Sequence, residues 1–88
     1  MNLEKLQKKF HRIELEDWGS FYYLQDPLLL EEGRDKWLQY KGYWVSSSGI
    51  VPAILEKFIQ IDGKNLEEEN LFLFQVLDYD HNILASNI

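Results

Sequence analysis

Residues 71–77, LFLFQVL, are apolar at almost every position, so both faces of an extended chain would be hydrophobic here. Successive side chains of a strand point to opposite faces of a sheet. A strand that is apolar on both faces is central in its sheet and covered on both sides. The segment therefore predicts a sheet with packed layers, and it places residues 71–77 in the interior.

Two other segments have the apolar spacing or the end signals of helices. Apolar residues recur every three or four positions from Leu3 to Ile13, which predicts an amphipathic helix over residues 3–16. Residues 51–62, VPAILEKFIQID, are the strongest helix candidate, because Pro52 can begin a helix and the glycine that follows can end it. We expect both segments to pack an apolar face against the sheet.

Residues 28–41 fit two structures. As a helix, the segment would follow the capping pair Asp26-Pro27 and end at Gly42. As part of a hairpin, KWLQYKGYWV would turn at Lys41-Gly42, although Lys-Gly is a weaker turn signal than Asn-Gly. The helix is the favoured prediction, and the hairpin remains the alternative. With the helix, residues 43–47 would form a short strand.

Together these elements predict an α+β fold. We expect a single domain over residues 1–88, with a mixed four-stranded sheet packed with about three helices and a β-hairpin at the C-terminus. The aromatic segment 18–24 would supply the first strand. The long connections between strands could serve as parallel crossovers, so a small α/β fold with βαβ units is the alternative.

Residues 77–84, LDYDHNIL, carry Asp78, Asp80 and Asn82 at alternate positions, as the first ligands of a calcium loop would be spaced. An EF-hand loop needs glycine at its sixth position for a sharp turn. That position is Ile83 here. Asp and Asn also favour turns, because their side chains bond to nearby backbone groups. We therefore predict a polar turn between two strands and no metal site.

No residue pattern predicts catalysis or a cofactor. The two histidines, His11 and His81, lie among lysines and at a turn, where we expect them to face solvent. Residues 46–48, three serines before Gly49, match neither a nucleophile elbow nor a phosphate-binding loop. We expect Ser48 to precede or cap the helix at 51–62. The sequence thus predicts a protein that is not an enzyme.

The net charge of −6 is unevenly distributed. The first helix carries a basic stripe of four residues, so the rest of the chain is more acidic than the total indicates; the four are Lys5, Lys8, Lys9 and Arg12. An acidic body argues against binding to nucleic acid and suits a basic protein partner. Apolar runs are too short for a membrane helix, and the chain has no cysteine. We expect a cytoplasmic protein that does not associate with membranes.

Eight aromatic side chains lie between residues 18 and 44, more than a core of this size is expected to bury. Tyr and Trp are enriched in binding hot spots. Carboxylates gathered in the sequence could steer a basic partner toward such aromatic contacts. The predicted partner-binding residues are Tyr22, Tyr23, Trp44, Glu67, Glu68, Glu69, Asp78 and Asp80.

The sequence therefore favours a small acidic protein-binding module, such as an immunity protein, an antitoxin or a phage-type inhibitor that neutralises a basic protein. A homodimer or accessory subunit, whose extra aromatics form its own interface, is the alternative. An enzyme with a site around the carboxylates and His81 is the least favoured. A dimer that forms without any partner would favour the second hypothesis.

Overall fold

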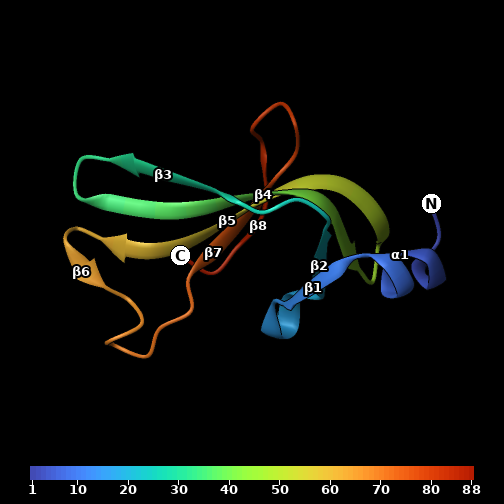
Figure 1. The fold of residues 1–88 in the computed structure, drawn as a ribbon, viewed down its shortest axis with the longest axis horizontal. Coiled ribbons are helices and arrows are strands. Elements are labelled where there is room, and N and C mark those ends of the chain that lie inside the picture. The colour runs from blue at the N-terminus through green and yellow to red at the C-terminus, as the bar shows by residue number, and fades with distance from the viewer.

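Two long antiparallel strands, β4 (Asp35–Ser46) and β5 (Gly49–Ile61), run through the centre of the computed structural model, which describes all residues 1–88 (Figure 1). The strands form one eight-stranded sheet in the order β1-β2-β4-β5-β7-β8, with β3 paired to β4 and β6 paired to β5. The other elements are α1 (Leu3–Lys9), β1 (His11–Glu14), a 3-10 helix (Glu16–Trp18), β2 (Ser20–Tyr23), β3 (Leu28–Glu32), β6 (Lys64–Asn65), β7 (Phe74–Leu77) and β8 (Ile83–Ser86).

Every strand pairing in the sheet is antiparallel. The predicted α+β fold, with a mixed four-stranded sheet and about three helices, is therefore wrong, and so is the alternative with parallel βαβ crossovers. The molecule contains one short α-helix and is mostly sheet. The physical reason is that short hairpin turns connect most of the strands, so the chain needs no helical crossovers.

The segment predicted as the strongest helix, residues 51–62, lies in β5 and the turn that follows it. Ala53 and Leu55 are buried on one face of this strand and Ile54 on the other. β5 pairs with β4 at one edge and with β7 at the other, so its backbone is hydrogen-bonded on both sides in the extended conformation. The spacing of the apolar residues in 51–62 is compatible with a helix and with a strand. Pairing with the neighbouring strands β4 and β7 stabilises the strand.

Residues 28–41 are neither a helix nor a hairpin that turns at Lys41-Gly42. They form β3 and the first half of β4, which are joined by a two-residue turn at Gly33-Arg34. Gly42 lies inside β4, where a Cβ atom would stand 1.9 Å from the backbone oxygen of Tyr22. This glycine allows β2 to approach β4 closely and does not make a turn.

The N-terminal helix is shorter than predicted and ends at Lys9, not at residue 16. Asn2 caps it, with its Oδ1 accepting from the backbone N–H of Lys5 at 2.9 Å, and Leu6 is fully buried. The chain then continues as β1, which pairs with β2. Arg12 lies on β1, so the predicted basic stripe of the helix is reduced to its lysines.

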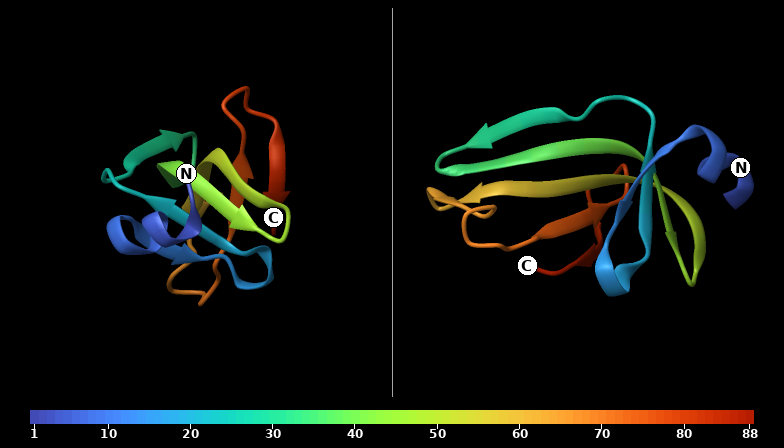
Figure 2. Two further views of the ribbon diagram at one scale, coloured as in Figure 1. Left: turned by 90° about the vertical axis from the view of Figure 1, so that its right-hand side faces the viewer. Right: turned by 60° about the horizontal axis from the view of Figure 1, so that its bottom comes forward.

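The largest group of buried side chains lies on one face of the sheet, which curls so that β2, β7 and β8 all contribute to it (Figure 2). We call this group the core cluster; it consists of Leu15, Phe21, Tyr40, Ala53, Leu55, Phe74, Val76 and Ala85. Side chains directly opposite each other on neighbouring strands share a face. The face of the sheet opposite the core cluster is called the outer face below.

The strand β7 is internal, because it lies between β5 and β8. It is shorter than the predicted strand 71–77, beginning only at Phe74, and its residues Phe74 and Val76 are fully buried. The predicted C-terminal hairpin is present as β7 and β8, with the polar turn of residues 78–82 between them. An internal strand in this part of the chain is thus confirmed.

Candidate functional site: an acidic groove floored by aromatic rings

A groove of about 690 Å³ opens at the end of the molecule where the β3–β4 and β5–β6 turns lie side by side (Figure 1). We call it the outer groove; its lining residues are Glu32, Gly33, Arg34, Asp35, Trp37, Glu56, Phe58, Asp62 and Gln75. Trp37 and Phe58 are direct partners across β4 and β5, and Glu56 and Gln75 are partners across β5 and β7. The groove therefore spans three internal strands of the outer face.

The rings of Trp37 and Phe58 form the apolar part of the groove. Their centres lie 5.8 Å apart with an angle of 39° between the ring planes. The indole Nε1–H of Trp37 is shielded from solvent and has no acceptor in the protein. A buried donor without an acceptor destabilises a fold by about 1–3 kcal/mol. The groove thus contains a tryptophan whose hydrogen-bonding capacity the chain itself does not use.

The two turns beside the groove are tied together through backbone and side-chain hydrogen bonds. The N–H of Gly63 donates to the carbonyl oxygen of Arg34 at 2.9 Å, and the Gln60 side chain donates to the same oxygen at 3.1 Å. The N–H of Asp62 donates to Oδ1 of Asp35 at 2.8 Å. These bonds place Asp35 and Asp62 at the rim of the groove in a defined arrangement.

Carboxylates dominate the charge of the outer groove. Glu32, Asp35, Glu56 and Asp62 line it, and Arg34 is its only basic residue. Arg34 lies 3.5 Å from Asp62 in an exposed ion pair, while Glu32 and Asp35 are direct partners across β3 and β4. Like charges in directly opposite positions destabilise a sheet. With four carboxylates and one guanidinium, the groove has an excess of negative charge.

None of the predicted aromatic contact residues is fully exposed at the surface. Tyr22 is only 2% exposed and belongs to the packed interior. Tyr23 is half-buried, with its ring 4.7 Å from that of Tyr40. Trp44 is also half-buried, and its Nε1–H donates to the backbone oxygen of Trp18 at 2.7 Å. The hydrogen bond and the packing of these side chains give them structural roles.

The predicted carboxylates are not brought together. Residues 67–69 are exposed in a turn that Asn65 caps, its Oδ1 accepting from the N–H of Glu67 at 2.9 Å. Asp78 and Asp80 belong to the β7–β8 turn, which lies on the other side of the molecule (Figures 1 and 2). Neither group of carboxylates lines the outer groove.

Asp78 organises the β7–β8 turn. Its Oδ1 accepts from the N–H groups of Asp80 and Asn82, both at 2.9 Å, and its Oδ2 accepts from the Asn82 side chain at 3.0 Å. The hydrogen bond from the Asn82 side chain is the main reason that the pKa of Asp78 lies below its ordinary value. His81 has a φ of 67° at the turn, a conformation that local hydrogen bonding stabilises. No group of three His, Cys, Asp or Glu side chains is placed to hold a metal ion.

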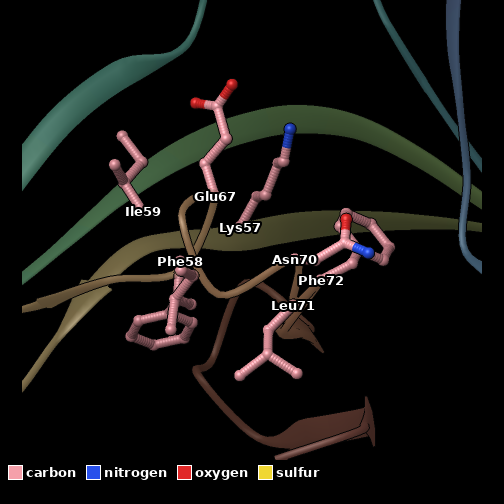
Figure 3. A pocket seen from close by; sticks show the side chains of 8 residues that line it. Lys57, Phe58, Ile59, Glu67, Asn70, Leu71 and Phe72 are labelled. Carbon is pink, nitrogen blue, oxygen red and sulfur yellow. The ribbon is translucent and has the colours of Figure 1, made fainter.

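A second hollow, of about 370 Å³, lies against the segment 66–72 (Figure 3). Nζ of Lys57 stands 5.7 Å from the centre of the Phe72 ring, in the range of a cation–π contact. Lys57 and Glu67 point to the same side in Figure 3, whereas Phe58 points the opposite way, toward the outer face. One basic and one acidic residue line this hollow, so it lacks the charge excess of the outer groove.

Sequence reasoning missed the residues of the outer groove. The sequence predicts Trp37 on a helix and Asp62-Gly63 at the end of another helix, whereas Trp37 lies on β4 and Asp62-Gly63 forms the β5–β6 turn. Asp62 and Gly63 have φ values of 51° and 82°, which suit a two-residue turn of type I′. Asp-Gly is one of the strongest short-range signals for such a hairpin. That signal identifies the turn, whereas the pairing of Trp37 with Phe58 follows only from the register.

Comparison with models of protein families, with curated proteins and with solved structures finds no match to this chain. No helix of the protein has the length and apolar character needed to cross a membrane. The outer groove therefore has to be interpreted from its own residues. Its distinguishing features are the Trp37–Phe58 pair and the excess of carboxylates around it.

Proposed function

We propose that this protein is a non-catalytic binding module that neutralises a basic protein, as an immunity protein or a phage-type inhibitor does, and that the outer groove is its principal contact. One observation supports the proposal above the others. The groove combines the aromatic pair Trp37–Phe58 with four carboxylates, which come from β3, β4, β5 and the β5–β6 turn. Hot spots of protein interfaces are enriched in Trp, Tyr and Arg.

The chemistry of the groove suits the side chain of an arginine or a lysine. A cation over a Trp or Phe ring is attracted by the ring's quadrupole, by about 0.5–1 kcal/mol where exposed and about 2 kcal/mol when desolvated. Glu32 and Asp35, which repel each other, could both accept hydrogen bonds from a guanidinium.

The net charge of −6 extends this preference beyond the groove. Complementary charge raises the rate of encounter between partners, and salt screens it over about 10 Å at 0.1 M ionic strength. The carboxylates outside the groove, including residues 67–69, contribute to this long-range attraction. Binding by a basic partner should therefore be faster at low salt, while the groove determines how long the complex lasts.

The test compares three forms of the protein as bait in extracts of the source organism, at low and at high salt. The wild-type chain should retain a basic protein that Trp37→Ala fails to retain. Trp18→Ala is the matched control, because Trp18 is exposed and lies outside the groove. The retained protein is then purified and its affinity for each form is measured. Equal affinity for wild type and Trp37→Ala would refute the proposal.

A further inference from the structure

The strand β3 leaves one edge of the sheet without a neighbour. It pairs only with the first half of β4, and β2 pairs with the second half of β4 along the same edge. An edge strand presents unpaired N–H and C=O groups that can hydrogen-bond to another chain. Natural sheets usually protect such edges with charges or proline, or cover them with another element. In β3 the first three residues are leucines, so the charged protection is confined to Glu31 and Glu32.

The side chains of β3 are exposed on both faces of the sheet. Leu28 is 58% exposed and lies on the outer face opposite Gln39, whereas Leu29 is 57% exposed and lies on the core face opposite Leu38. Single exposed leucines are common, but neighbouring ones on an open edge form a contact surface. A strand added beside β3 would cover both leucines, because its own side chains alternate between the same two faces.

The backbone groups that point away from the sheet can be assigned from the register. Hydrogen-bonded and non-bonded pairs alternate along an antiparallel ladder. Glu32 and Asp35 flank the two-residue turn and form a bonded pair, so the N–H and C=O groups of Leu29 and Glu31 face outward. The β5–β6 hairpin also has a two-residue turn and shows the same alternation. Its pair next to the turn is Ile61 with Lys64, and two positions further along the N–H of Leu66 donates to the oxygen of Ile59 at 2.9 Å.

The charge around this edge selects a basic occupant. Asp26, Glu31 and Glu32 are exposed, and none of them takes part in an ion pair. Glu32 also lines the outer groove, so the edge and the groove are continuous. The edge at β1 differs, since there Arg12 and Glu14 form an ion pair. A segment with basic residues near Glu31 and Glu32 and apolar residues near the leucines would match both features.

We infer that the free edge of β3 receives an extended segment of the basic partner as an additional antiparallel strand, with Arg or Lys residues followed by apolar residues. The inference rests on the proposed function and specifies how the partner binds. Backbone hydrogen bonds to Leu29 and Glu31 supply affinity, as in other cases of strand addition. Because the added strand runs antiparallel, its basic end lies beside the outer groove and its apolar end beside Leu28.

The test uses a short end-blocked peptide that begins with two arginines and continues with alternating valine and threonine. The control peptide has the same sequence, with N-methyl groups on the backbone nitrogens that would face β3. Amide-resolved titration of the wild-type protein should show saturable shifts over residues 28–32 and slowed hydrogen exchange at Leu29 and Glu31. The methylated peptide should bind at least about 10-fold more weakly.

Two protein variants distinguish the contribution of the Leu29 backbone to binding from that of the Leu29 side chain. Leu29→Pro removes the outward N–H and should abolish the slowed exchange at Glu31, since proline is tolerated where an edge N–H faces solvent. Leu29→Ala keeps that N–H and should weaken binding less. If Leu29→Pro fails to fold, the methylated peptide still decides the question. Equal binding of the two peptides to the wild-type protein overturns the inference.

The remaining outcomes distinguish this inference from the proposed function. Loss of the basic partner in Trp37→Ala, without slowed exchange at Leu29 and Glu31 in the complex, would overturn strand addition and leave the groove as the contact. Slowed exchange at both residues in a dimer of the protein alone would show that a second copy occupies the edge, which overturns the inference. Absence of any shift at millimolar peptide would overturn it as well.

Discussion

The backbone N–H of Gly63 donates to the carbonyl oxygen of Arg34 at 2.9 Å and thereby joins the turn of the β3–β4 hairpin to the turn of the β5–β6 hairpin. These two residues are 29 positions apart in the chain, and neither hairpin alone would position the other. The bond holds the acidic rim of the outer groove beside its aromatic floor.

Gly42→Ala should destabilise the protein by about 3 kcal/mol, because the new Cβ would lie 1.9 Å from the backbone oxygen of Tyr22. A backbone atom in a paired strand cannot move aside as a flexible side chain can. Gly33→Ala is the matched control, with no atom within 4 Å of the new Cβ and only the strain of a φ of 61°. That strain should destabilise by about 1 kcal/mol. Urea unfolding measures both values, and equal losses would contradict the close approach of β2.

Phe74→Ala should lower the free energy of unfolding by about 3–5 kcal/mol, the range for a buried Phe. The Phe74 side chain is fully buried in the core cluster. Leu73→Ala should cost less, about 1–2 kcal/mol, because Leu73 precedes β7 and is only partly buried. Chemical denaturation of both variants gives the comparison. A smaller loss for Phe74 than for Leu73 would contradict the position of the core.

Asp78→Asn should destabilise the protein at neutral pH but not in strong acid. The pKa of Asp78 is lowered from its ordinary value of 3.8, mainly by the hydrogen bond from the Asn82 side chain. The charged form therefore stabilises the fold above pH 3.8, and this contribution is lost as the pH falls through the lowered pKa. Thermal midpoints from pH 7 to pH 2 should converge for the two proteins. Asp80→Asn, which removes a carboxylate from the same turn but leaves the Asp78 hydrogen bonds in place, is the control.

Variants of the outer groove should affect the two rates of partner binding differently. Trp37→Ala should weaken the binding free energy by about 2 kcal/mol or more if Trp37 is a hot spot, and most of this loss should appear as faster dissociation. Glu32→Gln combined with Glu56→Gln removes two carboxylates of the groove, so it should slow association, reduce its dependence on salt and also speed dissociation. Neutralising Glu67, Glu68 and Glu69 is the control for charge outside the groove, and it should leave dissociation unchanged. Surface-based kinetics at two salt concentrations separates these effects. Faster dissociation of the triple variant would move the contact to that turn.

Local residue chemistry was sufficient for several features of this chain. Asp78 and Asn82 predicted a polar turn between strands, since Asx side chains bond their own backbone, and the structure contains this turn. Asn65 caps the turn that contains Glu68, with its Oδ1 accepting from the Glu68 N–H at 3.4 Å. Such features depend on atoms only a few residues apart. They form in the same way in almost any fold that contains them.

The large elements were decided by tertiary structure. Residues 51–62 bury apolar side chains equally well in a helix or in a strand covered on both faces, and pairing with β4 and β7 selects the strand. The same holds for residues 28–41, where Gly42 serves the close approach of Tyr22. The outer groove depends on the register that places Trp37 opposite Phe58 and on the bond from Gly63 to Arg34. The sequence by itself determined the acidic, aromatic-rich character of the protein. Long-range strand pairing alone brought the carboxylates and aromatic rings of the groove together, because cross-strand contacts join residues that are far apart in the chain.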